Sequence, residues 1–143
     1  MHINIKLLTP TAKIPQKMST NAAGYDIFAN LTDDVTLNPL QRVLIPTGFA
    51  MALPENNEAQ IRTRSGLAIN EGLVVLNSPG TIDSDYRGEI KVILINLSDK
   101  QIVIKNEMRI AQMVISKHEN PEFVTVNDLN STLRGEKGFG SSN

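Results

Sequence analysis

The sequence contains no cysteine and no tryptophan, and it has only two histidines among 143 residues. Without cysteine the chain has no disulfide framework, no thiolate zinc site and no cysteine nucleophile, a composition that fits a reducing compartment. His2 and His118 do not lie at ligand spacing, so we expect no transition-metal site built from protein side chains.

Neither sign of charge dominates, and no long hydrophobic stretch is present. Fourteen Lys and Arg residues against 15 Asp and Glu residues leave a formal net charge of -1, which provides no overall positive field to hold a nucleic-acid backbone. No run approaches the roughly 18 apolar residues of a membrane-spanning helix, and the N-terminus lacks an apolar run of signal-peptide length. We therefore expect a cytoplasmic protein that binds neither nucleic acid nor membrane.

The apolar residues that are present follow a strand pattern. Length and composition predict one compact domain. Apolar residues alternate with polar or small ones over residues 3–7, 35–37 and 49–53, which is typical of half-buried strands. Residues 43–45 and 92–95 are short continuous apolar runs, which favour strands covered on both faces by a second sheet or a partner subunit. Turn residues interrupt the chain about every 8 to 12 residues, the spacing of a sandwich or jelly roll.

One segment departs from the strand pattern. Residues 65–72 begin with Ser65, which can cap a helix, and end with Gly72, which can terminate one, so we expect a short helix there. The predicted fold class is therefore all-β, a jelly-roll-like sandwich or barrel with one short helix.

The end of the chain differs in character from the rest. Residues 130–143 are polar and rich in glycine, and such a segment cannot bury enough apolar surface to order itself. We predict a β domain over residues 1–133 and a flexible glycine-rich tail over residues 134–143.

Residues 80–90 are the first candidate for chemistry. They combine two glycines, three carboxylates and a tyrosine in what we interpret as one hairpin. An ordinary turn explains the Asp, Ser and Gly residues. Tyr86, however, is an uncommon aromatic side chain among acidic residues, close to an aspartate that could position a water molecule.

Three arginines are the second candidate. Arg64 directly precedes the expected helix, where free N-H groups and the helix dipole favour an anion. Arg109 lies near an amide residue, and Arg134 lies in the tail. Each alone is better explained as a solvated surface residue. If the three converged, they would compensate the charge of a polyphosphate.

Five short segments lie in order between residues 23 and 142. They are Ala23-Gly24-Tyr25-Asp26-Ile27, Arg64-Ser65-Gly66-Leu67-Ala68, Asn77 with Gly80 to Gly88, Arg109-Ile110-Ala111-Gln112-Met113, and Arg134-Gly135 with Gly138 to Ser142. Together they resemble the five motifs of the trimeric dUTPase family, which hydrolyses dUTP to dUMP and pyrophosphate and so keeps uracil out of DNA and supplies dUMP for thymidylate synthesis. Glu107, Met108 and Lys137 depart from the family pattern, and none of them carries a role in chemistry.

The resemblance implies a jelly-roll subunit and a homotrimer with active sites at the subunit interfaces. It also implies Mg²⁺ held mainly by the triphosphate and by water, with Asp26 in the water shell of the metal. Asp83 would be the catalytic residue, because a carboxylate can hold a water molecule and accept its proton as that water attacks the α-phosphorus. The implied substrate-binding residues are Arg64, Ser65, Gly66, Asn77, Gly80, Ile82, Asp83, Tyr86, Gln112, Arg134, Phe139, Gly140 and Ser141.

These residues divide by the part of dUTP that each would contact. Arg64, Ser65, Gln112 and Arg134 would hold the phosphates, and the Asn77 amide with nearby backbone groups would bind the uracil edge. Tyr86 would lie against the deoxyribose. In this interpretation the tail closes over the site and Phe139 stacks on the uracil, a contact worth about 1 to 3 kcal/mol per base.

Two alternatives remain at this stage. A dCTP deaminase of the same superfamily is the rival enzyme, and dUTP or dUMP formed from dCTP would identify it. A regulatory member without catalysis is the rival of another class, although Asp83, Arg64, Tyr86 and Phe139 together favour an active enzyme.

Overall fold

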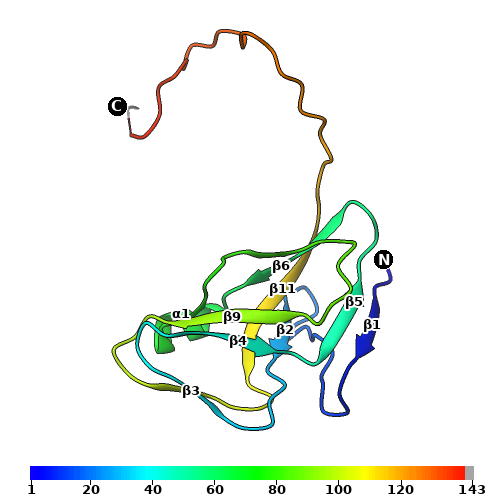
Figure 1. Cartoon of the computed structure of the whole chain (residues 1–143), viewed down its shortest axis with the longest axis vertical. Helices are drawn as coiled ribbons and strands as arrows, with labels where there is room; N and C mark the ends of the chain where they lie inside the picture. The colour runs from blue at the N-terminus through cyan, green and yellow to red at the C-terminus, as the bar shows by residue number, and fades with distance from the viewer. Residues whose placement is uncertain (141–143) are drawn as a thin grey trace.

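The computed structural model describes residues 1–140, which form β-strands and one short helix (Figure 1). The elements in chain order are β1 (Asn4–Leu7), β2 (Tyr25–Phe28), β3 (Val35–Leu37), β4 (Arg42–Pro46), β5 (Phe49–Ala52), β6 (Asn57–Arg62), α1 (Ser65–Glu71), β7 (Leu73–Val75), β8 (Gly80–Ile82), β9 (Lys91–Asn96), β10 (Ile102–Ile104) and β11 (Arg109–Lys117). This composition of elements confirms the predicted all-β class with a single short helix.

Two larger sheets enclose the core. One has the strand order β2-β11-β6-β8 and the other β4-β9-β7, with two-stranded pairs β1-β5 and β10-β3 beside them. All of these described pairings are antiparallel. Both sheets place apolar side chains in one buried cluster, for example Ile27 and Ile61 from the first sheet and Ile45 and Leu94 from the second. The result is the jelly-roll-like arrangement expected from the strand spacing.

The two continuous apolar runs form neighbouring strands of the second sheet, β4 and β9. In β9, Val92 and Leu94 are buried in the core, whereas Ile93 and Ile95 on the other face are only partly covered. Leu44 of β4 pairs with Ile93 and is 53% exposed. Within one chain the runs are therefore covered on the core face alone, and the opposite face presents apolar side chains.

Strand β1 differs from the half-buried strand predicted for residues 3–7. Its four residues are all exposed, because it pairs only with β5 and no second layer covers it. Ile5 is 37% exposed and Leu7 48% exposed. The alternating pattern identified the strand but not its neighbours, which decide how much of it is covered.

The helix forms where it was predicted, but Ser65 does not cap it. Ser65 is the first helical residue, and Arg64 occupies the N-cap position without a side-chain hydrogen bond to the helix. Gly72 ends the helix as predicted, in the left-handed conformation at φ 65°, and its N-H donates to the carbonyl of Ala68 at 3.2 Å. Glycine suits this position because it adopts positive φ without steric cost. This helix is too short and too polar to cross a membrane, and the described residues contain no other.

The segment interpreted as a hairpin over residues 80–90 is not one. Strand β8 pairs with β6 in the first sheet, whereas β9 pairs with β4 and β7 in the second. Residues 83–90, which we call the crossing loop, therefore carry the chain from one sheet to the other. The turn residues were recognised correctly, but strand partners are chosen by long-range packing that a local pattern does not contain.

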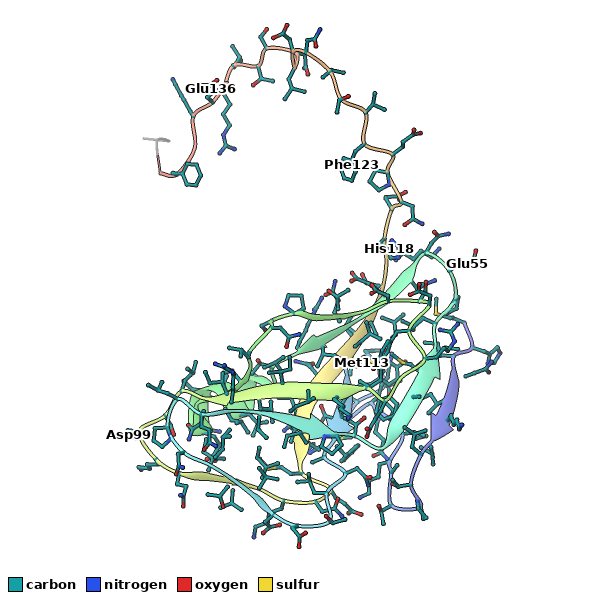
Figure 2. The ribbon with its side chains drawn as sticks, viewed as in Figure 1. Glu55, Asp99, Met113, His118, Phe123 and Glu136 are labelled. Carbon is teal, nitrogen blue, oxygen red and sulfur yellow. The ribbon has the colours of Figure 1, made fainter. Side chains whose placement is uncertain are left out.

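After β11 the chain leaves the sheets as an extended arm, residues 118–140 (Figure 1). His118 lies exposed at the end of the strand, and every residue from 119 to 137 is exposed. Figure 2 shows Met113 among the strands, Phe123 on the first part of the arm and Glu136 near its far end. Phe123 is 92% exposed and Leu129 is 86% exposed, so the exposed extended segment begins before residue 134, where we placed the start of the tail.

Candidate functional site

Arg64 and Arg109 meet on one buried carboxylate. The Asp26 side chain on β2 accepts from Arg64 Nε at 3.3 Å through Oδ1 and from Arg109 Nη1 at 3.2 Å through Oδ2. Arg64 Nη1 also donates to the main-chain carbonyl of Arg109 at 3.0 Å. We call Asp26, Arg64 and Arg109 the arginine cluster. Asp26 is only 8% exposed, so its charge is compensated by these guanidiniums rather than by water.

The arginine cluster carries one net positive charge and retains free donors. A guanidinium has five N-H groups, and those of Arg64 Nη2 have no partner among residues 1–140. Arg64 donates from Nε and Nη1, which fixes the plane of its guanidinium. The free N-H groups in that plane can donate to the oxygens of a phosphate.

Two other predicted phosphate-binding residues, Gln112 and Ser65, and the predicted substrate-binding residue Gly66 lie near this cluster in the chain. Gln112 on β11 is opposite Asp26 and donates through Nε2 to the carbonyl of Thr63 at 3.1 Å. Ser65 and Gly66 follow Arg64 and are exposed, and a Cβ added to Gly66 would meet nothing within 4 Å. The start of the helix therefore faces open space next to the positive cluster.

Gly24 explains why Gln112 can lie so close to β2. A Cβ added to Gly24 would clash with Gln112 Oε1, so a side chain at residue 24 would displace the Gln112 amide. Gly24 is not among the glycines with positive φ, so it provides space rather than an unusual backbone angle.

The second group of predicted residues surrounds a cavity at the crossing loop. The cavity has a volume of about 290 Å³, near the lower limit of small-molecule sites. It is lined by residues of the second sheet (Leu44, Lys91 and Ile93), of β8 (Thr81 and Ile82) and of the crossing loop (Asp83, Tyr86 and Glu89), and by Asn77. We call it the loop pocket, and its size and mixed lining suit a nucleoside.

Gly80 allows a close approach to Asn77, which lines the loop pocket. Gly80 is buried, and a Cβ placed on it would lie 3.0 Å from Asn77 Nδ2. The Tyr86 hydroxyl donates to the carbonyl of Glu89 at 3.1 Å, which holds its ring beside the pocket. Asp83 lines the pocket and is exposed, so its carboxylate is accessible to water.

The arginine cluster and the loop pocket are separate groups of residues in one chain. None of Asp26, Arg64 and Arg109 lines the loop pocket, and neither does Gln112.

The remaining predicted residues lie on the arm. Arg134 Nε donates to the carbonyl of Lys137 at 2.9 Å, so its described contact is within the arm. Phe139 is fully exposed, and Gly140 has a φ of 88°. Ser141 lies outside the described residues. Of the three arginines proposed to converge, the chain by itself brings together Arg64 and Arg109 but not Arg134.

Sequence reasoning missed the link that Asp26 makes between the two arginines. Asp26 is 38 positions from Arg64 and 83 positions from Arg109, so no local spacing indicates the contact. The only signal is that each of the three residues lies in one of the five motif segments.

Comparison with known proteins identifies the family. The dUTPase family model matches residues 10–143. A deoxyuridine 5'-triphosphate nucleotidohydrolase of a Hydrogenobaculum species is 52% identical over 142 residues, which cover 99% of this chain and 98% of that protein. The corresponding protein of Cytophaga hutchinsonii is 54% identical over 129 residues, 90% of this chain and 84% of its own.

Solved structures agree with these sequence matches. A point mutant of the phage 80alpha dUTPase superimposes with a TM-score of 0.88 at 30% identity, covering 99% of this chain and 98% of the phage protein. A second mutant of the Staphylococcus bacteriophage 80alpha dUTPase, with dUpNHpp, has a TM-score of 0.85 at 30% identity and the same coverage. Because the matches span nearly the whole chain and include all five motif segments, this protein belongs to the dUTPase family.

Proposed function

We propose that this protein hydrolyses dUTP to dUMP and pyrophosphate. The arginine cluster binds the phosphate end of the substrate, and the loop pocket binds the nucleoside end. The observation that carries the proposal is the pairing of a positive cluster that suits phosphate with a nucleoside-sized pocket that has a carboxylate in its lining. Membership in the dUTPase family supports the same reaction.

The phosphate end depends on charge and position. The free Nη2 N-H groups of Arg64 donate hydrogen bonds to the phosphate chain, with Ser65, Gly66 and Gln112 beside it. Asp26 and Arg109 hold Arg64 in place. Phosphoryl transfer needs little covalent chemistry from the protein, because positioning and charge compensation supply most of the catalysis.

The loop pocket, which binds the nucleoside end of dUTP, also provides the general base that accepts a proton in the reaction. In the loop pocket the Asn77 amide, with backbone groups near Gly80 and Ile82, binds the uracil edge, and Tyr86 lies against the deoxyribose. The Asp83 carboxylate holds a water molecule and accepts its proton as the water oxygen bonds to the α-phosphorus. The bond from that phosphorus to the bridging oxygen breaks, and pyrophosphate leaves in line.

The residues present fit Mg²⁺ that is coordinated mainly by the substrate rather than by protein side chains. No group of three potential ligands occurs in residues 1–140, so triphosphate and water must supply most of the coordination. Asp26 uses one hydrogen bond on each carboxylate oxygen and keeps acceptor capacity for a metal-bound water molecule. When bound, Mg²⁺ supplies charge compensation on the phosphates.

Pyrophosphate release tests the proposed function. We expect release from dUTP with Mg²⁺ and at most a small fraction of that rate with UTP, dTTP or dCTP, because the pocket has to exclude a 2'-hydroxyl, a C5 methyl and a different base edge. Equal rates with all four nucleotides would contradict the assignment. Formation of dUTP or dUMP from dCTP would identify the deaminase instead, and nucleotide binding without turnover would identify a regulatory protein.

A homotrimer is the expected assembly. It is supported by the arginine cluster and the loop pocket, which share no residue in one chain and which a neighbouring copy can bring together, and by the exposed apolar face around Leu44 and Ile93. Light scattering of the purified protein should give three times the 15.7 kDa chain mass. A monomer with full activity would show that one chain forms the whole site.

A cytoplasmic location, as predicted from the sequence, is part of the same proposal.

A further inference from the structure

The ring of Tyr86 lies where a side chain on residue 88 would have to be. A Cβ added to Gly88 would lie 2.3 Å from the Tyr86 hydroxyl oxygen and 2.5 Å from the ring carbon Cζ. The same hydroxyl donates to the carbonyl of Glu89 at 3.1 Å. Gly88 does not have a positive φ, so glycine is needed at this position for space and not for its backbone freedom.

The backbone around the ring is held by the protein itself. The Tyr86 N-H donates to the carbonyl of Asp83 at 3.2 Å. The Arg87 guanidinium donates to the carbonyls of Ser84 at 2.6 Å and Tyr86 at 2.9 Å. The loop path therefore does not depend on the space beside Gly88. A methyl group there would meet the outer end of a tyrosine side chain, which can rotate away at lower cost than the backbone.

We propose that Gly88 is a positioning residue for sugar specificity, acting through Tyr86; this rests on the proposed function. The missing side chain lets the outer end of the ring lie against the backbone at residue 88, beside the loop pocket, before nucleotide binds. A fixed ring presents a rigid surface to the sugar and leaves no space for a ribose 2'-hydroxyl. A displaced ring loses both its contact with Gly88 and its hydrogen bond to Glu89, and it no longer excludes that hydroxyl.

The test compares kcat/KM for dUTP and UTP in four proteins: wild type, Gly88→Ala, Tyr86→Ala and the double variant. Gly88→Ala should lower the dUTP to UTP ratio by about 10- to 100-fold, since an apolar pocket rejects an added hydroxyl by about 100-fold at most. In the Tyr86→Ala background, Gly88→Ala should change the ratio no further, because the residue it acts through is absent. Ser84→Ala, in the same loop and without the clash, is the matched control and should keep the wild-type ratio.

Two results would overturn the inference. Gly88→Ala could leave the dUTP to UTP ratio unchanged, and an equal fall in kcat/KM for both nucleotides would then indicate a merely structural role. It could also lower the ratio by the same factor with and without Tyr86. If wild type releases no pyrophosphate from dUTP, the proposed function itself fails and this inference fails with it. Selective dUTP hydrolysis by wild type with an unchanged ratio in Gly88→Ala refutes the inference alone.

A measurement on the wild-type protein covers the case in which Gly88→Ala does not fold. With selectively labelled tyrosine, the nucleotide-free protein should show a nuclear Overhauser effect between the Tyr86 ring and the Gly88 α-protons. Only two tyrosines occur in the sequence, so the signals can be assigned by Tyr25→Phe. Absence of this effect would show that the ring is not held against Gly88 and would overturn the inference.

Discussion

Asp83→Asn should lower kcat for dUTP by about 100- to 10,000-fold, the usual contribution of a positioned general base. The amide has nearly the same shape as the carboxylate but cannot accept the proton of the attacking water. Binding and folding should change little, because the residue is exposed and the turn is held by the Asp83 carbonyl, which the substitution retains. Single-turnover kinetics separate the chemical step from binding of a non-hydrolysable dUTP analogue.

Asp85→Asn is the matched control for this variant. Asp85 lies two positions further along the crossing loop, is exposed and has no assigned role, so its removal tests the effect of one lost charge in the same loop. We expect its kcat to stay within about twofold of wild type, as for a surface substitution away from special features. If Asp83→Asn turned over dUTP at the wild-type rate, Asp83 would be only a turn residue and the proposed mechanism would be wrong.

Ending the chain after Leu133 should abolish most dUTP hydrolysis while stability and assembly stay nearly unchanged. The described hydrogen bonds of residues 134–140 are made within the arm, so their loss removes no contact with the core. The removed segment carries Arg134, which can pair with the phosphates, and Phe139, which can cover the base. If ordering of this tail completes the site, kcat/KM should fall by at least about 100-fold, since small errors in substrate position already have effects of that size.

Point variants separate the two contributions of the tail. Arg134→Ala should weaken binding of the triphosphate, and Phe139→Ala should remove a stacking contact of about 1 to 3 kcal/mol. Glu136→Gln keeps the length and glycines of the tail and serves as the control. Circular dichroism and light scattering of the truncated protein should match wild type.

Limited proteolysis tests whether the tail closes over nucleotide. In the free protein residues 134–140 are almost entirely exposed and should be cut readily. A non-hydrolysable dUTP analogue with Mg²⁺ should protect them, because ordered backbone does not fit a protease site. Equal cleavage in both conditions, or full activity of the truncated protein, would show that the tail is not a lid.

Much of the fold follows from short-range patterns. Alternation over residues 49–53 and the apolar run at 92–95 predicted strands that the structure contains, because the two faces of a strand are set by the chain itself. Gly72 ends the helix for a similarly local reason, namely its tolerance of positive φ. The five motif segments likewise identified the family from the sequence before any contact between them was known.

Tertiary structure alone decided which of these elements meet. Strands β8 and β9 are close in sequence but join different sheets, so residues 83–90 cross between the sheets instead of turning back in a hairpin. Asp26 joins Arg64 to Arg109 across distant parts of the chain. Tyr86 fills the space that Gly88 leaves open. Sheet partners, ion pairs and close contacts depend on the packing of the whole chain, and the same local pattern is compatible with several partners. The sequence therefore determined the elements and the chemical groups that each one carries, and packing determined which of these groups meet in the arginine cluster and which line the loop pocket.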